Sequence, residues 1–114
     1  MRAQRKDGNQ GSVVAGFRAC GCVVVPMSRE AGFDLLVGLP HGRGWVCVEV
    51  KDGELSPSRR ELTDAEREFS ELCQYRGLPW VLVESLEAAV GLANSQRRIA
   101  MILEGAQVVF EIEP

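Results

Sequence analysis

Apolar and polar residues alternate in several short stretches of the chain, and this spacing predicts β-strands. Four such stretches are rich in Val and Leu and span about 22–26, 34–38, 45–51 and 79–84. Pro26 ends the first of them, and the Gly-rich segment 40–44 joins the second to the third, which predicts a hairpin. A last alternation over 97–113 predicts a C-terminal hairpin, with a helical continuation through 99–103 as the alternative.

Apolar residues spaced three and four apart predict helices between these strands. The predicted helices span about 10–20, 63–76 and 85–95. Asn9 or Ser12 is expected to cap the first helix, and Ser85 the third. The residues expected to face inward from the second and third helices are Leu62, Ala65, Phe69, Leu72, Cys73, Leu86, Val90 and Ala93.

The order of these elements is α-β-β-β-α-β-α followed by two strands, which favours an α/β protein with a central sheet flanked by helices in three layers. A chain of 114 residues is long enough for one hydrophobic core, so a single domain over 1–114 is expected. Residues 1–8 are polar and are expected to be flexible, and the hairpin over 97–113 is expected to extend the domain.

The charge of the chain limits the kinds of partner that it binds. The net charge is -3 and the pI about 5.2, which argues against a protein that coats nucleic acid through bulk charge. Basic residues still gather at 2–6, 59–60 and 97–98, either as solvated surface or as a local basic groove. No apolar run approaches the roughly 18 residues of a membrane span, and no apolar segment follows the basic residues near the start. We therefore expect no signal peptide, no membrane partner and a cytoplasmic location.

The cysteines and the single histidine exclude several kinds of site. Cys20, Cys22, Cys47 and Cys73 are expected to be reduced in a cytoplasmic protein, most of them as small buried residues. A structural zinc site would need a second Cys or His pair beside the C-x-C spacing at 20–22. His41 is the single histidine and lies in a loop, so the residues for a His-based catalytic triad or a His-rich metal site are lacking.

Three charged residues at the ends of the second and third strands form the strongest candidate site. Glu49 and Lys51 are two residues apart, so they share one face of their strand. Asp34 opens the preceding strand and approaches Glu49 in a hairpin of suitable register. Two carboxylates are hard ligands for Mg²⁺, which activates water and stabilises charge on a phosphate. The alternative is a solvated strand end, or a surface ion pair between Asp34 and Lys51 that contributes little to stability.

A lysine beside two carboxylates can also take part in the hydrolysis of a phosphodiester. The neighbouring acids keep the ammonium of Lys51 protonated. A protonated amine at that position orients the attacking water or neutralises the charge that builds on phosphorus.

Asp34, Glu49 and Lys51 resemble the PD-(D/E)XK nuclease motif. Their surroundings, over about residues 5–93, are similar to the small phage and bacterial nucleases of the VRR-NUC and Holliday-junction-resolvase-like group. The shared features are an early helix, the strand GFDLLVG, the strand end EVKDG, the helix start LTDAE and the segment VESLEAA.

The resemblance implies a restriction-endonuclease-like fold and a DNA endonuclease that depends on Mg²⁺, with Mn²⁺ as a substitute. It further implies that Asp34 and Glu49 bind the metal and that Lys51 orients the attacking water. A homodimer is a separate hypothesis, because a chain this short has little surface for a DNA duplex beyond its active face. The setting would be the cytoplasm of a bacterial or phage-infected cell.

The sequence departs from the pattern of this group in two places. Phe33 replaces the proline that usually precedes the first acid, which affects only how the backbone enters the strand. Ser12, with Gln10 nearby, stands where the first helix often carries a metal-binding glutamate, and Glu30 is a weak candidate to replace that acid. A catalytically weak or inactive nuclease fold that serves as a binding module, such as a phage protein that engages a host factor, is therefore the alternative function.

Further residues near the motif have accessory roles under the same resemblance. Glu66 matches a position that faces the site, although Thr63 and Glu66 also form a capping-box pattern. Arg59 and Arg60 follow the motif as phosphate contacts or as a mobile basic loop. Trp45 and Trp80 are expected to pack within the fold rather than to stack on bases.

Overall fold

The computed structural model describes residues 8–95, 99–104 and 107–112. The bounds of its helices and strands are α1 Gln10–Ala19, β1 Val23–Pro26, β2 Leu35–Leu39, β3 Gly44–Val50, α2 Asp64–Arg76, β4 Trp80–Val83, α3 Leu86–Asn94, β5 Ile99–Glu104 and β6 Gln107–Ile112. Two short 3-10 helices, η1 (Arg29–Ala31) and η2 (Pro57–Arg60), lie in segments predicted to be loops. All predicted helices and strands are present. The expected flexibility of 1–8 falls, apart from Gly8, outside the described residues.

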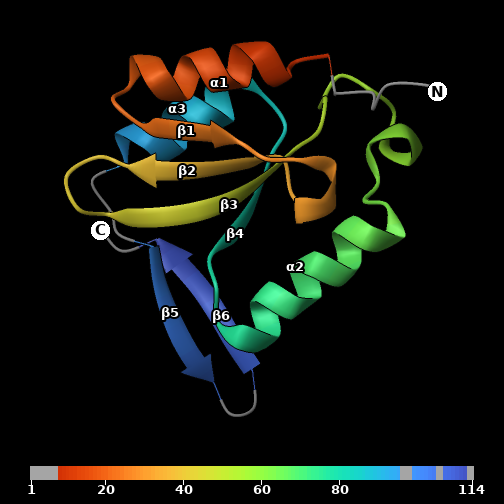
Figure 1. Ribbon diagram of the computed structural model, residues 1–114, viewed down its shortest axis with the longest axis vertical. Coiled ribbons are helices and arrows are strands. Elements are labelled where there is room, and N and C mark those ends of the chain that lie inside the picture. The colour runs from red at the N-terminus through yellow and green to blue at the C-terminus, as the bar shows by residue number, and fades with distance from the viewer. Residues whose placement is uncertain (1–7, 96–98, 105–106, 113–114) are drawn as a thin grey trace.

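Four strands form one mixed sheet in the order β1-β2-β3-β4 (Figure 1). The first three strands are antiparallel neighbours, and the β2–β3 pair is the hairpin that the Gly-rich segment 40–44 predicted. β4 runs parallel to β3, because α2 supplies the long crossover that a parallel pair requires. Helices flank this sheet, which confirms the predicted fold class.

The hydrophobic core lies between the sheet and the pair α1 and α3. Alternate residues of β2 and β3 point to this side, and α1 packs on α3 so closely that a Cβ on Gly16 would lie 2.4 Å from Leu86 Cδ1. The fully buried side chains include Val13, Phe17, Leu35, Val37, Val46, Val48 and Val50. Because the core uses every second strand residue, the residues between them face the other side of the sheet.

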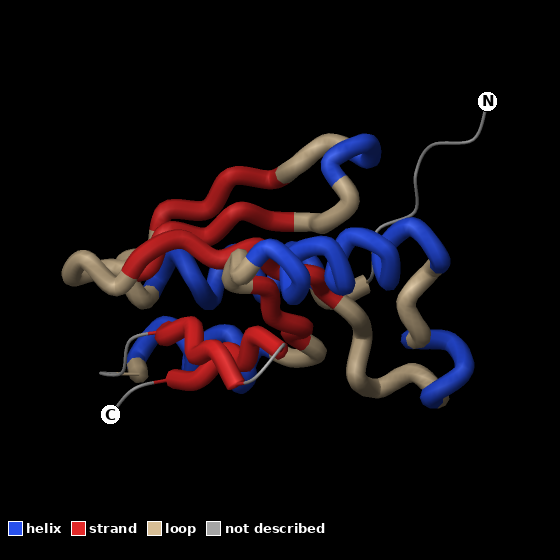
Figure 2. Tube along the Cα trace, turned by 90° about the horizontal axis from the view of Figure 1, so that it is seen from below, coloured by secondary structure: helices blue, strands red, loops and turns tan. Residues whose placement is uncertain are grey.

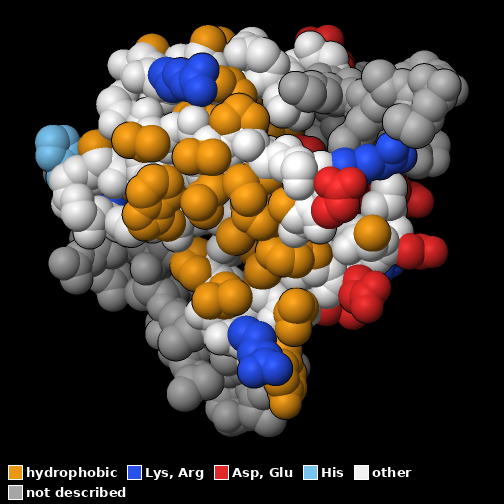
Figure 3. Space-filling model, in the orientation of Figure 1, with side chains coloured by type: hydrophobic (Ala, Val, Ile, Leu, Met, Phe, Trp, Pro, Cys, Tyr) orange, Lys and Arg blue, Asp and Glu red, His pale blue; other side chains and the backbone are white. Residues whose placement is uncertain are grey.

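That other face of the sheet is only partly covered. Val23, Val25 and Trp45 are 57%, 41% and 53% exposed, and Figure 3 shows hydrophobic side chains gathered over the strands between α1 and α2. Trp45 packs across the strand pair onto Gly38, where a Cβ would lie only 3.0 Å from the indole ring. The glycine therefore makes room for the tryptophan.

The inward faces predicted for α2 and α3 are partly wrong. Of the expected stripe on α2 only Cys73 is buried, and Leu72 is 49% exposed, because α2 runs beside β4 and β6 instead of lying flat on the sheet (Figure 2). On α3, Ala89 and Ala93 are buried while Leu86 is 42% exposed. The alanines face the core because α3 packs tightly against α1.

β5 and β6 form a separate antiparallel pair with Ile99 opposite Ile112. The predicted C-terminal hairpin is therefore present, and the helical alternative for 99–103 is wrong. β6 contacts α2, so the pair lies beside that helix rather than extending the main sheet. In the described part of the chain, none of the helices is both long and apolar enough to cross a bilayer.

The substitution Phe17→Ala tests the position of the core. Phe17 is 0% exposed between α1 and the sheet, so its truncation should lower the free energy of unfolding by about 3–5 kcal/mol in urea denaturation. Val23→Ala, on the exposed face, should change it by less than about 0.5 kcal/mol. Equal effects of the two substitutions would contradict this assignment.

Candidate active site

The register of the β2–β3 hairpin brings Asp34 beside the C-terminal end of β3. Leu35 pairs with Val48, and the backbone N–H of Asp34 donates to Val48 O at 3.1 Å. In return the backbone N–H of Val50 donates to Asp34 Oδ2 at 2.8 Å. This bond holds the Asp34 carboxylate across the strand that carries Glu49.

Glu49 is buried without compensation. Its side chain is 1% exposed, and neither carboxyl oxygen accepts a hydrogen bond from the described part of the chain. Burial, and then the adjacent carboxyls of Glu66 and Asp34, raise the pKa of Glu49 to about 10. A polar group in this condition is unfavourable unless a cation or a donor completes its surroundings.

Lys51 stands two residues further along β3 and reaches the same side of the sheet. It is 8% exposed, and its Nζ lies 2.8 Å from Glu66 Oε1. The same Glu66 oxygen accepts the N–H of Thr63 at 2.8 Å, while Thr63 Oγ1 accepts the N–H of Glu66 at 3.1 Å. Glu66 is thus both half of a capping box and the partner of Lys51, so the two interpretations of this residue are compatible.

The pKa of Glu66 moves in the opposite direction from that of Glu49. Burial by itself would raise it, but the Glu49 carboxyl, the Lys51 ammonium and the Thr63 N–H outweigh burial and lower it to about 2. Neighbouring carboxyls with pKa values pushed far apart are typical of functional sites. In this site Glu66 carries the charge that fixes Lys51.

The end of β3 is tied down by backbone bonds that the sequence did not reveal. Lys51 N donates to Val83 O at 3.0 Å, and Gly53 N donates to Glu84 O at 2.9 Å. A Cβ on Gly53 would lie 2.8 Å from Glu84 O, which explains the glycine of the EVKDG segment. Asn9 occupies the N-cap position of α1, yet its Nδ2 donates instead to Lys51 O and Glu84 O, at 3.0 and 3.2 Å.

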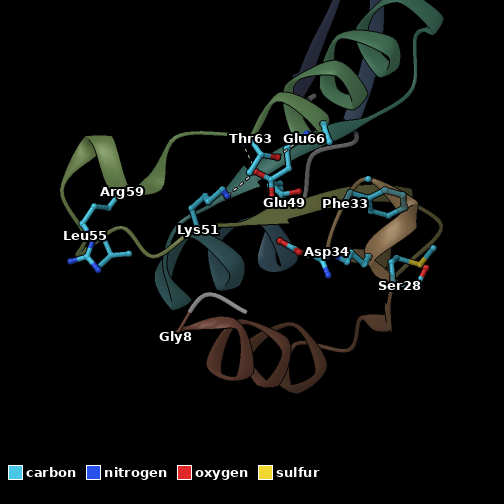
Figure 4. Close-up of a pocket in the computed structure, with 14 residues that line it drawn as sticks. Gly8, Ser28, Phe33, Asp34, Glu49, Lys51, Leu55, Arg59, Thr63 and Glu66 are labelled. Carbon is cyan, nitrogen blue, oxygen red and sulfur yellow. Dashed lines mark hydrogen bonds and ion pairs between the residues drawn. The ribbon is translucent and has the colours of Figure 1, made fainter. Parts of the chain in front are cut away.

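A cavity of about 710 Å³ opens over these groups (Figure 4). It is lined by Gly8, Met27, Ser28, Arg29, Gly32, Phe33, Asp34, Glu49, Lys51, Leu55, Arg59, Thr63, Ala65 and Glu66. Asp34, Glu49 and Lys51 therefore share one cavity. Arg29 and Phe33 also line it. No role was predicted for Arg29, whose one sequence signal is its position in the segment that leads into Asp34.

Other candidates lie away from this cavity. Ser12 is exposed and its Oγ donates to Asn9 O at 2.9 Å, Gln10 is buried in α1, and neither lines the cavity. Glu30 is exposed outside it as well. The Nη1 of Arg60 lies 2.8 Å from Glu84 Oε2 and its Nε donates to Leu55 O, so the two arginines of η2 differ in their surroundings.

Asp34 and Glu49 fit a divalent cation by their chemistry. The observation that favours one is the pair of buried Glu49 oxygens that accept no hydrogen bond. Among the described residues, no three His, Cys, Asp or Glu side chains form a complete cage for an ion. Proteins usually hold Mg²⁺ with one or two carboxylates and leave its other coordination positions to water and substrate phosphate.

Comparison with known proteins gives one informative match. The sequence matches no family model and no curated protein. The structure is similar to a solved VRR_NUC domain, with a TM-score of 0.56 and 30% sequence identity. The match covers 76% of this chain and 91% of that domain.

The substitution Glu49→Gln tests whether the buried carboxyl is a strain on the fold. In EDTA it should raise the free energy of unfolding by about 1–3 kcal/mol at neutral pH, because the wild-type carboxyl must take up a proton to be buried at that pH, whereas an amide is already neutral. The folded-state pKa is raised, so the wild type should lose stability relative to the variant as pH rises from about 4.5 toward about 10.

Urea denaturation across this pH range measures the difference. The exposed Glu54→Gln is the matched control and should follow the wild type. A wild type that is more stable than Glu49→Gln at every pH would contradict the expectation.

Proposed function

The chain belongs to the VRR-NUC family of PD-(D/E)XK nuclease-like domains, and we propose that it is a divalent-metal-dependent endonuclease that hydrolyses phosphodiester bonds in DNA. The observation that carries the proposal is the buried Glu49 carboxyl, which accepts no hydrogen bond and lies beside Asp34 in the cavity that Lys51 lines. This arrangement is unfavourable for a purely structural strand end and favourable for holding a cation.

Asp34 and Glu49 would hold Mg²⁺, with Mn²⁺ as a substitute. When bound, the ion would lower the pKa of a coordinated water and stabilise negative charge on the phosphate. The chain holds the two carboxyl groups in place in advance: the Val50 N–H fixes that of Asp34, and burial in β3 fixes that of Glu49. Little rearrangement is then needed when the substrate arrives.

Lys51 would act on the attacking water and on the phosphate. Its pairing with Glu66 at 2.8 Å keeps the ammonium positively charged and restricts its rotamers. A fixed ammonium at this position orients a water by donating a hydrogen bond to the water oxygen, and it offsets charge that develops at phosphorus. Glu66 is then a positioning residue, which acts through Lys51.

Arg59 would contact the DNA backbone. It is exposed and lines the cavity from η2, on the side of Lys51 and Leu55 (Figure 4). An arginine at the rim gives a chain of net charge -3 a local positive contact for phosphate. Phosphate contacts of this kind position the strand without reading its sequence.

One observation favours a second function, a nuclease fold that binds a partner without cleaving DNA. Ser12, at the position that often supplies a further acid, is turned away and bonded to Asn9 O. Under this alternative the chain would retain its fold without binding a divalent cation at Asp34 and Glu49. Metal binding therefore separates the two functions.

A cleavage assay tests the nuclease directly. Plasmid, linear duplex, single-stranded and four-way-junction DNA are each incubated with the protein in Mg²⁺, Mn²⁺ or EDTA. We expect cutting that requires a divalent cation, that Glu49→Ala abolishes, and that Lys51→Ala slows roughly 100- to 1,000-fold because a fixed cation is lost. Glu68→Gln, an exposed change on α2, should cut like the wild type.

Calorimetric titration of Mg²⁺ or Mn²⁺ accompanies the assay. A folded wild type that neither cuts DNA nor binds either cation would refute the nuclease and favour the binding module. Cation binding that survives Glu49→Ala would refute the assignment of the ligands.

The two arginines of η2 should respond differently to removal. Arg59→Ala should weaken DNA binding and reduce the slope of log affinity against log salt by about one, since one phosphate contact is lost. Arg60→Ala should leave that slope unchanged and lower the free energy of unfolding by about 1 kcal/mol, because its guanidinium is bonded to Glu84 and Leu55. Fluorescence anisotropy over a salt series measures the slope, and the reverse assignment would contradict it.

A further inference from the structure

Two aromatic rings are stacked beside the candidate metal ligands. The centroids of Phe33 and Phe69 are 5.0 Å apart with an angle of 19° between the planes. Phe33 immediately precedes Asp34 and lines the cavity, while Phe69 projects from α2. Phe33 is therefore the direct sequence neighbour of a residue that would hold the cation.

The backbone at Gly32 is shaped to accommodate this pair. Gly32 has a φ of +88°, and a Cβ at that position would lie 3.1 Å from the Cδ1 and Cγ atoms of Phe69. Any other residue would be strained there and would press on the ring. Phe69 is thus held against the turn that carries Phe33, and it supports the Phe33 ring from the α2 side.

The stacked pair does not belong to the hydrophobic core. Among the described residues, the core and the hydrophobic side chains packed against it include neither Phe33 nor Phe69. Both rings are partly exposed. A supported ring that is left at the wall of a polar cavity is available to a ligand with an aromatic face.

The charged groups of the cavity indicate where a DNA strand would run. Figure 4 shows Phe33 on one side of Glu49 and Asp34, and Arg59 beyond Lys51 on the other. A strand whose phosphate lies at the carboxylates and whose backbone continues toward Arg59 brings a neighbouring base to the Phe33 ring. The cavity, at about 710 Å³, is within the roughly 300–1,000 Å³ of sites that enclose small ligands.

We propose that Phe33, supported by Phe69, is a stacking platform for one unpaired nucleobase next to the scissile phosphate. In an intact duplex both faces of each base are covered by its neighbours, so only an unpaired base can present a face to the ring. The substrate class is therefore DNA with unpaired bases at the cut, such as single strands and splayed ends. This inference rests on the proposed function and narrows its substrate.

Abasic DNA tests the platform in the whole chain. Affinity is measured by anisotropy in Ca²⁺, a hard cation with the same ligand preference, for a short labelled thymidine oligonucleotide, for its duplex, and for oligonucleotides in which a single abasic residue is moved along the strand. Gels of the same samples report whether the strand stays intact. Parallel reactions in Mg²⁺ report cleavage.

We expect the wild type to bind the single strand more tightly than the duplex. One abasic position should weaken binding roughly five- to hundredfold, the range of a lost base–aromatic stack. Phe33→Ala should weaken binding to the intact strand by a similar factor and should be insensitive to that abasic position. Phe33→Trp should retain the sensitivity, and Leu72→Ala, an exposed apolar change on α2, should behave as the wild type.

Two results would overturn the platform: no abasic position matters to the wild type, or Phe33→Ala weakens single-strand and duplex binding equally. The first result needs no variant, so it applies even if Phe33→Ala fails to fold. Mg²⁺-dependent cleavage without an abasic effect removes the platform and leaves the nuclease. An abasic effect in a folded wild type that never cuts DNA removes the nuclease and leaves the platform.

Discussion

A carboxyl side chain that is almost fully buried and accepts no hydrogen bond is costly for a folded protein, and the architecture around Glu49 is arranged to maintain one. The register of the β2–β3 hairpin places Asp34 beside β3. The parallel pairing of β3 with β4 keeps the backbone at Glu49 extended. α2 begins where its capping glutamate meets Lys51. The core on the opposite face supplies the rigidity that keeps these charges together.

Glu66 shows how one side chain connects the fold to the chemistry. One of its oxygens accepts hydrogen bonds from both the Thr63 N–H and the Lys51 ammonium. The free N–H groups at the start of a helix favour a negative charge, and so does the lysine. The helix start and the lysine therefore stabilise the same ionised state, which explains why the pKa of Glu66 falls to about 2 while burial and the neighbouring carboxyls raise that of Glu49 to about 10.

Much of the fold could be predicted from the sequence because its signals are local. Alternating valines, the Gly-rich turn at 40–44 and the Thr63–Glu66 spacing each determine the structure of a few neighbouring residues. The faces of α2 and α3 were harder to predict, since periodicity shows which side of a helix is apolar but not what will cover it. Leu72 and Leu86 are exposed for this reason, while Ala89 is buried where two helices approach closely.

The candidate site was predictable where its residues share one hairpin and not where distant segments meet. Asp34, Glu49 and Lys51 follow from strand periodicity and a turn. The bonds of Asn9 to Lys51 and Glu84, and of Arg60 to Glu84, join parts of the chain with no common local pattern. Phe33 was noticed in the sequence only for its effect on the backbone, because its partner Phe69 lies on another element.

The two long-range bonds of Asn9 bear on the order in which the molecule folds. They close separations of 42 and 75 residues, whereas the bond between Val50 and Asp34 closes only 16. Short loops close at a smaller entropic cost, so the β2–β3 hairpin should bring its two acids together early. The strand end that carries Lys51 gains its hydrogen bonds around Glu84 only after that residue has reached its place in the fold. A chain still emerging from the ribosome would therefore contain the acids long before it contained an assembled site.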